Sequence, residues 1–376
     1  MAIPAQAQHI LEDAVRAGVG SGAALAWQHA GERSLSATGR TALSNWSNQK
    51  VTTETHFDLA SLTKPMVTLT LLVGELAAGR LALADRLDKH LPVARQTARG
   101  AATIGQLLSH TSGAPAWLDF FAATRELPAD CRAAAVQRAV LTTGNAHAPG
   151  TQAVYSDLGY MALGWLLEHL AGQPLDVLYQ QRIARPLGLK ASFRRISAPQ
   201  ALPAPVVATE VWAPRCPDGQ PLWGAVHDDN CAALDGVAGH AGLFGSIADV
   251  ATWADCWLDA ARGVESGLDR PLCLPPELCR GLIASPGCAG TTWRHGWDTP
   301  SRPGSSAGDS APVDAFGHLG FTGTSVWLAP AADAFAVLLT NRVHPTREAM
   351  AGIRALRPHL HDALWSVLPA PGSKSP

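Results

Sequence analysis

Ser61 and Lys64 place a hydroxyl and an amine three residues apart in the motif SLTK (61–64). Their side chains share a face only if a helix begins there. The following residues, MVTLTLLVGEL (66–76), are apolar on nearly every side, which predicts a buried helix over 61–79. A desolvated amine can take the hydroxyl proton, and a helix N-terminus favours negative charge on an attacked oxygen. The pattern therefore predicts a serine nucleophile assisted by a lysine.

The same spacing occurs a second time, at Ser47 and Lys50. That copy lies in the polar stretch SNWSNQK (44–50) and runs into VTT (51–53), which favours a strand. Nothing there buries the lysine or builds a helix, and the spacing alone does not make a site. We expect no chemistry at Ser47.

Three further motifs join polar residues to turns and element ends. PGTQAVYSDLGY (149–160) places Tyr155 and Asp157 two residues apart, after a Pro-Gly turn and just before an apolar helix. LLSHTSG (107–113) ends a short helix with a polar loop that stops at glycine. GHLGFTGTS (317–325) opens a segment that alternates or runs apolar as paired strands do.

In this order and spacing the motifs resemble the serine β-lactamase and penicillin-binding-protein superfamily, in its class C-like branch. D-Aminopeptidases, D,D-carboxypeptidases, family VIII esterases and class C β-lactamases belong to that branch. The resemblance runs from the first strand near Ala23 to the last helix near Trp365, and includes PLGL (186–189) and GVAGHAGLF (236–244). It implies a β-lactamase/transpeptidase-like α+β fold and a serine hydrolase that acts through an acyl-enzyme.

The resemblance also implies roles for single residues. Ser61 is then the acylated nucleophile, Lys64 its proton partner, and Tyr155 the group that shuttles protons between nucleophile and leaving group. HLG (318–320) stands where many relatives carry Lys-Thr-Gly. Its strand supplies the second oxyanion N–H, at Phe321, opposite that of the nucleophile.

Two positions depart from the family's pattern. Asp157 stands where β-lactamases and penicillin-binding proteins usually have asparagine, and a carboxylate only accepts hydrogen bonds. His318 replaces a lysine, so a fixed cation becomes a group that titrates at about pH 6.5. With Gly320 and Phe321, these residues are expected to bind substrate. The departures favour an esterase or D-amino-acid peptidase; a β-lactamase or D,D-carboxypeptidase, and a non-catalytic member that binds a ligand or partner, remain alternatives.

The composition of the chain limits which binding partners and which cellular compartment we expect for the protein. The net charge is −2, and no long run of Lys and Arg occurs, which argues against nucleic acid and anionic membranes as partners. The first residues lack the basic and apolar regions of a signal peptide, and no apolar run approaches the about 18–20 residues of a membrane span. Seven cysteines without Cys-x-x-Cys pairs indicate reduced thiols. We expect a cytoplasmic enzyme that acts on a small ester, amide or peptide.

Apolar periodicity and turn residues predict the elements and their arrangement. Strands are expected at both chain ends, with helices between them, so one antiparallel sheet would be assembled from the two termini. We expect a single domain over 1–370, with a sheet lobe from about 1–60 and 290–370, a helical lobe over about 61–289, a cleft between them and a disordered tail at 371–376. The expected strands are 23–28, 33–38 and those within 313–343. The expected helices are 9–17, 61–79, 103–109, 131–142, 157–171, 174–184, 247–262 and, interrupted at Pro358, about 345–367.

Weaker patterns indicate neither cofactor nor metal. GVGSGA (18–23) spells a dinucleotide fingerprint, but it follows a helix and precedes a strand, the reverse of a phosphate cradle. HDD (227–229) and HLH (359–361) lack a third ligand at motif spacing. His240, among small residues, is expected to hold a loop near the cleft, and Asp58 to cap the nucleophile's helix.

Overall fold

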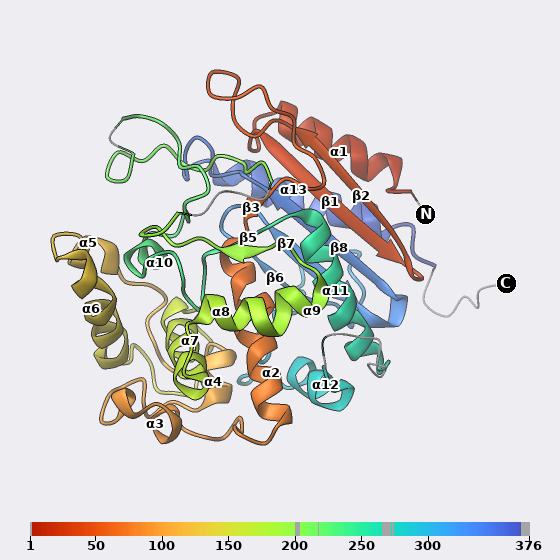
Figure 1. Ribbon diagram of the computed structural model, residues 1–376. Coiled ribbons are helices and arrows are strands. Elements are labelled where there is room, and N and C mark those ends of the chain that lie inside the picture. Colours follow the sequence, from red (N-terminus) through yellow and green to blue (C-terminus); the bar gives the residue numbers. More distant parts are fainter. Residues whose placement is uncertain (1, 200–203, 217, 265–271, 273, 370–376) are drawn as a thin grey trace.

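A five-stranded antiparallel sheet, in the order β2-β1-β8-β7-β6, occupies the upper right half of the molecule in the view of Figure 1. The computed structural model describes residues 2–199, 204–216, 218–264, 272 and 274–369, so the expected tail at 371–376 lies outside the described residues. Strand β1 pairs with β8, which confirms that the two chain ends build one sheet. The strands are β1 (Gly22–His29), β2 (Glu32–Gly39), β6 (Phe316–Leu319), β7 (Ser325–Ala329) and β8 (Ala334–Thr340).

The first two strands form the predicted hairpin and extend one residue beyond each predicted end. Ala30 and Gly31 connect them, with φ of 52° and 78°. Two consecutive positive φ values suit a two-residue hairpin turn whose twist matches the strands. Strand β1 is buried along almost its whole length because helices cover both faces of the sheet.

Helices cover the two faces of the sheet (Figure 1). Helices α1 (Ala5–Arg16) and α13 (Met350–Trp365) pack on one face, where Leu11, Trp27 and Leu360 share a buried cluster. Helix α11 (Ile247–Arg262) lies against the other face, and its Asp255 accepts a 2.6 Å hydrogen bond from Gln28 in β1. This amphipathic helix, expected from the sequence to lie within the helical lobe, therefore packs against the sheet.

Helix α13 continues through Pro358, so the predicted interruption is wrong. A proline inside a helix removes one backbone hydrogen bond. Leu356, Leu360 and Leu364 on either side of it are buried against the sheet, and this packing holds both halves of the helix in line.

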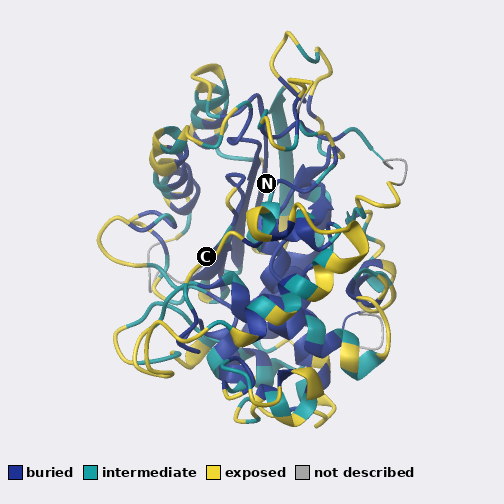
Figure 2. Cartoon of the chain, turned by 90° about the vertical axis from the view of Figure 1, so that its left-hand side faces the viewer, coloured by how far each residue is buried: buried dark blue, intermediate teal, exposed yellow. Residues whose placement is uncertain are grey.

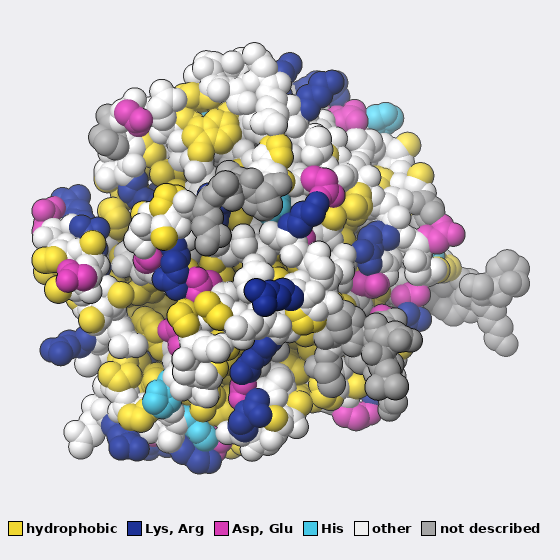
Figure 3. Space-filling model, viewed as in Figure 1, with side chains coloured by type: hydrophobic (Ala, Val, Ile, Leu, Met, Phe, Trp, Pro, Cys, Tyr) yellow, Lys and Arg dark blue, Asp and Glu magenta, His cyan; other side chains and the backbone are white. Residues whose placement is uncertain are grey.

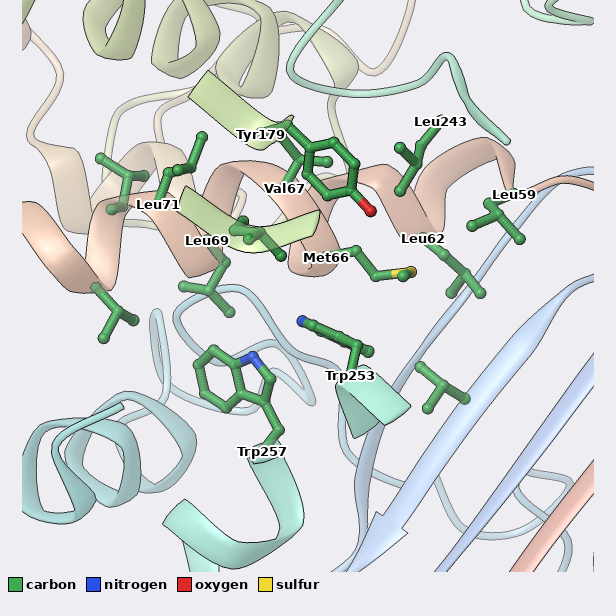
Figure 4. Close-up of a cluster of buried hydrophobic side chains, with 14 of the residues drawn as sticks. Leu59, Leu62, Met66, Val67, Leu69, Leu71, Tyr179, Leu243, Trp253 and Trp257 are labelled. Carbon is green, nitrogen blue, oxygen red and sulfur yellow. The ribbon is translucent and has the colours of Figure 1, made fainter. Parts of the chain in front are cut away.

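The helical lobe surrounds the predicted buried helix. Residues 61–79 form three consecutive pieces: the 3-10 helix η1 (Ala60–Leu62), the π-helix η2 (Lys64–Leu69) and α2 (Thr70–Ala77). Leucines and Met66 of this segment pack against two tryptophans of α11 (Figure 4), and both indoles, Trp253 and Trp257, donate to Thr70 Oγ1 at 3.1 and 3.2 Å. The buried character read from the sequence is thus confirmed.

The other helices agree with the predicted positions where those were given. Helix α7 spans Asp157–Ala171 as predicted, and the stretch 174–184 divides into α8 and a π-helix, η4. The remaining elements are α3 (Leu87–His90), η3 (Pro92–Ala94), α4 (Ile104–Leu108), α5 (Phe120–Thr124), α6 (Ala129–Thr142), α8 (Leu175–Tyr179), η4 (Gln180–Ala184), α9 (Arg185–Leu187), α10 (Asp229–Ala233), α12 (Pro276–Ala284) and η5 (Pro330–Ala332).

A second, small sheet lies next to the nucleophile segment and was not predicted. It consists of β3 (Phe57–Asp58), β5 (Leu243–Gly245) and β4 (Ser192–Phe193), in that order. Strands of two or three residues are too short to show an alternating pattern. The sheet ties the residues before Ser61 to the GVAGHAGLF segment.

Burial and surface charge follow this layering. Buried residues concentrate in the sheets and in the helices against them, and exposed ones in outer helices and loops (Figure 2). Acidic and basic side chains are interspersed over the face shown in Figure 3. Within the described ranges, no helix has both the length and the apolar character needed to cross a membrane.

Candidate active site

Ser61 lies on the 3-10 turn η1, directly after the short strand β3. The cap position of this turn is Leu59 rather than the predicted Asp58, which lies one residue earlier. Asp58 still holds the turn, since its Oδ1 accepts from the Ala60 N–H at 2.8 Å and its Oδ2 from the His227 N–H at 2.6 Å. Ala60 has a φ of 48°, a left-handed conformation that is unfavourable for a residue with a Cβ. Such strain concentrates at functional sites.

Lys64 is completely buried one turn beyond the nucleophile. Its Nζ donates to Ser61 Oγ at 2.9 Å, to Asp157 Oδ1 at 2.7 Å and to the His240 carbonyl at 3.2 Å. The i, i+3 pairing read from the sequence is present in the structure. Lys64 also opens the π-helix η2, a form common at functional sites.

Lys64 is desolvated as the sequence suggests, but desolvation does not make it a neutral amine at rest. Burial does favour the neutral amine, but the Asp157 carboxylate and Tyr155 outweigh it and raise the pKa to about 12. The resting lysine is therefore an ammonium ion.

Tyr155 completes the group around the nucleophile. Lys64 Nζ lies 4.9 Å from the centre of the Tyr155 ring. Burial raises the pKa of the Tyr155 phenol, although contacts with Lys64 and Ser61 each lower it. The phenol is therefore neutral at pH 7, and the three residues that the sequence selected converge.

His318, on β6, does not titrate where the sequence suggested. Burial and the nearby Lys64 lower its pKa to about 3, so the predicted protonation at about pH 6.5 is wrong. Its Nδ1 lies 2.8 Å from the Leu319 carbonyl and donates to it, because a carbonyl can only accept. The ring is neutral, and its Nε2 has no hydrogen-bond partner among the residues that the structure describes.

The turn after β6 packs directly against the nucleophile turn. A Cβ on Gly320 would lie 2.8 Å from the Leu59 carbonyl oxygen, so only glycine fits there. Thr322 Oγ1 donates to the Asp58 carbonyl at 2.7 Å and holds the two segments together. In the described part of the chain, the backbone N–H groups of Ser61 and Phe321 have no hydrogen-bond acceptor.

A cavity of about 500 Å³ opens at these residues, which is within the range of small-molecule sites. Each of the substrate-contacting residues proposed from the sequence lines it, whereas Lys64 lies behind the wall. The lining includes Ser61, Tyr155, Asp157, His318, Gly320 and Phe321.

Comparison with known proteins identifies the family of this chain. A family model described as beta-lactamase matches residues 10–360. The chain belongs to the beta-lactamase family. It is a serine hydrolase by that membership. A Bacillus subtilis (strain 168) protein named N-acetylmuramyl-L-alanine amidase is 30% identical over 318 residues, which cover 78% of this chain and 70% of the relative.

Solved structures share the fold over nearly the whole chain. SurE in complex with D-Leu is 25% identical, with a TM-score of 0.69 over 98% of this chain and 79% of SurE. EstCE1, described as a hydrolase with promiscuous acyltransferase activity, is 21% identical, with a TM-score of 0.70 over 96% of this chain and 97% of EstCE1. The beta-lactamase/transpeptidase-like α+β fold expected from the sequence is confirmed.

Within this beta-lactamase family site, Asp157 occupies a different position from the one expected. Its Oδ1 bonds to Lys64 rather than pointing only at a substrate, although the side chain also lines the cavity. The residue thus controls the charge on the lysine as well as the polarity of the pocket. Sequence reasoning missed this because the two residues are 93 positions apart.

Sequence reasoning also missed two ring residues beside Tyr155. His110 lies 4.5 Å and Trp293 5.1 Å from the Tyr155 ring, between centroids. His110 has a φ of 59°, and its Nδ1 accepts from the Ser156 N–H at 3.1 Å. Burial lowers the His110 pKa well below its ordinary value, so the ring stays neutral. The LLSHTSG motif marked the segment of His110 but not this contact; nothing in the sequence marked Trp293.

His240 holds a loop at the cleft, as predicted. Its Nε2 lies 3.0 Å from Asp228 Oδ1, while its carbonyl accepts from Lys64. Asp157, Asp228 and His240 each offer a ligand atom within 4.8 Å of the others. The Lys64 ammonium already bonds to two of these three residues and supplies positive charge there.

The HDD segment forms an ion network at the cleft wall. His227 Nε2 lies 3.0 Å from Glu210 Oε2, and Arg347 binds Glu210 at 2.6 Å and Asp229 at 3.1 Å. The HLH segment is structural as well, since His361 Nδ1 bonds to the Ser306 carbonyl at 2.7 Å.

Proposed function

We propose that this serine hydrolase cleaves small esters or amides through an acyl-enzyme on Ser61. The observation that carries the proposal is the 2.9 Å contact between Lys64 Nζ and Ser61 Oγ at the wall of the cavity. Nucleophile, base and proton donor within hydrogen-bond reach are the requirement for this chemistry.

The reaction begins when Lys64 loses a proton to solvent base. The neutral amine accepts the Ser61 proton as Oγ bonds to the substrate carbonyl carbon. Tyr155 then gives its phenol proton to the leaving nitrogen or oxygen, and the Lys64 ammonium returns a proton to Tyr155. Water then attacks the carbonyl carbon of the Ser61 acyl-enzyme, with the same proton transfers in reverse, and the carboxylic acid product is released. The N–H groups of Ser61 and Phe321 bind the oxyanion.

Amide substrates carrying a D-residue, and short esters, fit the site best. The Bacillus subtilis relative is named an amidase, and the SurE structure contains D-Leu. A β-lactam or a D,D-peptide is the alternative. We place it second, since Asp157 is held by Lys64 and cannot donate to a substrate carbonyl as an asparagine would.

Labelling with a fluorescent phosphonate, followed by mass spectrometry, tests the proposal. We expect modification of Ser61, and loss of p-nitrophenyl butyrate hydrolysis by at least about 10³-fold in Ser61→Ala. Ser47→Ala is the matched control, because Ser47 has the same spacing to a lysine but its hydroxyl bonds to Thr41 and Gln49 instead. Labelling at another residue, or none, would favour the non-catalytic alternative.

We propose that the enzyme forms a single domain and works in the cytosol on small-molecule substrates. Cys131, Cys216, Cys231 and Cys288 have free thiols, which supports a reducing compartment.

A further inference from the structure

Both N–H groups assigned to the oxyanion hole belong to peptide groups whose carbonyl oxygens receive a buried side-chain donor. The Ser61 N–H shares a peptide group with the Ala60 carbonyl, which accepts from Thr63 Oγ1 at 2.7 Å. The Phe321 N–H shares one with the Gly320 carbonyl, which accepts from Arg357 Nη2 at 2.8 Å. The same arrangement therefore occurs on both sides of the hole.

Both donors are directed by other contacts. The Thr63 hydroxyl accepts from the Leu243 N–H at 3.2 Å, which leaves its own proton for Ala60. Arg357 reaches from α13 to the turn after β6 and also binds the Thr324 carbonyl at 2.8 Å. Thr63 has no exposed surface and Arg357 only 9%. These hydrogen bonds are therefore protected from competing water.

A donor on the carbonyl of a peptide group makes the N–H of the same group a better donor, because electron density moves toward the oxygen. Chained hydrogen bonds strengthen one another by about 10–30% per bond. A charged donor such as a guanidinium acts more strongly than a neutral one. The gain in hydrogen-bond strength at the Ser61 and Phe321 N–H groups is largest when negative charge develops on the substrate oxygen opposite them.

We propose that Thr63 and Arg357 are positioning residues that polarise and aim the two oxyanion donors. The proposal rests on the proposed Ser61 chemistry. It assigns a role to two side chains that act through the peptide groups of the oxyanion donors, one at each side of the hole.

An ester and its thionoester analogue separate this role from simple structural support. Sulfur is a weak acceptor, so a thionoester gains little from the two N–H groups. We expect Thr63→Val and Arg357→Met to lower kcat for the ester about tenfold, less than the 10²–10³-fold lost with a whole oxyanion donor. KM and thionoester hydrolysis should change little. Thr63→Ser and Arg357→Lys keep a donor, so their ratio of kcat for the ester to kcat for the thionoester should return most of the way to the wild-type value.

Thr324→Val is the matched control. Its buried hydroxyl also donates to a backbone carbonyl, that of Leu59 at 3.1 Å, but the N–H of that peptide group, at Ala60, bonds to Asp58 instead of facing the hole. Its ester-to-thionoester ratio should equal that of the wild type.

Equal losses on both substrates, or an unchanged ratio in Thr63→Val and Arg357→Met, would overturn the inference. If Arg357→Met does not fold, Thr63→Val decides, since valine has the shape of threonine. Phosphonate labelling separates this failure from a failure of the proposed function. If the wild type is labelled at Ser61 but the variants keep the wild-type ratio of ester to thionoester hydrolysis, only the polarising role is rejected. If Ser61 is not labelled, both proposals are rejected.

Discussion

Lys64 and Asp157 form a buried ion pair, with 2.7 Å between Nζ and Oδ1, next to the Ser61 hydroxyl. The lysine side chain has no exposed surface and that of the aspartate has 16%. The pair keeps the amine protonated, so the base must be generated before the serine can react. Asp157 therefore sets the pH at which this site works.

Asp157→Asn should shift the activity of the enzyme toward lower pH. With a Lys64 pKa of about 12, kcat/KM of the wild type should rise about tenfold per unit between pH 7 and 9, as the neutral amine becomes more populated. Asparagine removes the charge that raises this pKa while burial remains, so kcat/KM should level off at a lower pH. Initial rates with p-nitrophenyl butyrate check this, and superimposable profiles would contradict it. Asp229→Asn, which loses a contact with Arg347 instead, should keep the wild-type profile.

Lys64→Arg should be nearly as damaging as Lys64→Ala. Arginine keeps the positive charge but does not give up its proton, so it cannot accept one from Ser61. We expect both variants to lose at least about 10³-fold in kcat, a typical cost for a group of the catalytic unit. Lys50→Arg should be near wild type. Substantial activity in Lys64→Arg would show that the site needs charge rather than proton transfer.

His318 should make no contribution to pH dependence near neutrality. Its pKa of about 3 leaves the ring neutral from pH 5 to 8. The ratio of kcat/KM for a carboxylate-bearing ester, such as a monosuccinate, to that for a neutral ester should stay constant over this range. A preference for the carboxylate that appears below about pH 6.5 and vanishes in His318→Gln would show that the ring does titrate.

Glu210→Gln should destabilise the fold at pH 7 but much less in acid. Burial raises the Glu210 pKa, but His227 and Arg347 together lower it to about 2. A carboxylate with a lowered pKa stabilises the folded state above its unfolded pKa of about 4.5, and this stabilisation is lost as pH falls toward 2. We expect a loss of about 2–3 kcal/mol in the free energy of unfolding at pH 7, measured with urea, and a smaller loss at pH 3.5.

The control is Glu54→Gln, which removes an exposed pair with Lys190. Exposed pairs contribute little, so this variant should unfold like the wild type at both pH values. A Glu210→Gln effect that is the same at pH 7 and 3.5 would indicate lost packing rather than lost charge.

Short-range patterns predicted the nucleophile and its partner correctly because they depend on one turn of helix. Ser61 and Lys64 are local neighbours, and the apolar run after them is enough to signal burial. Tyr155 was selected by resemblance alone, and the structure brings its ring to Lys64.

The charge states of Lys64 and His318 could not be predicted from the sequence because they depend on residues that are distant along the chain. The pKa of Lys64 rises rather than falls since Asp157 reaches it from another helix, and that of His318 falls because the surrounding fold buries the ring. Likewise, the long helices and the sheet were predictable from their periodicity. The strands of the small sheet exist only because tertiary contacts align two or three residues.

The pairing of β1 with β8 also determines when the protein can acquire activity during synthesis. Ser21 and Asn341 are 320 positions apart, yet they hydrogen-bond beside this pairing. The nucleophile segment leaves the ribosome long before the turn that carries Phe321. A nascent chain that has not reached this turn therefore has Ser61 and Lys64 but no second oxyanion donor, and strand β1 stays unpaired on one edge until β8 has been made. Such long-range pairing folds slowly and leaves apolar strands exposed meanwhile. Under the proposed mechanism, both oxyanion donors are present only after the turn that follows β6 has been made, and the open edge of β1 is covered only after β8 has joined it.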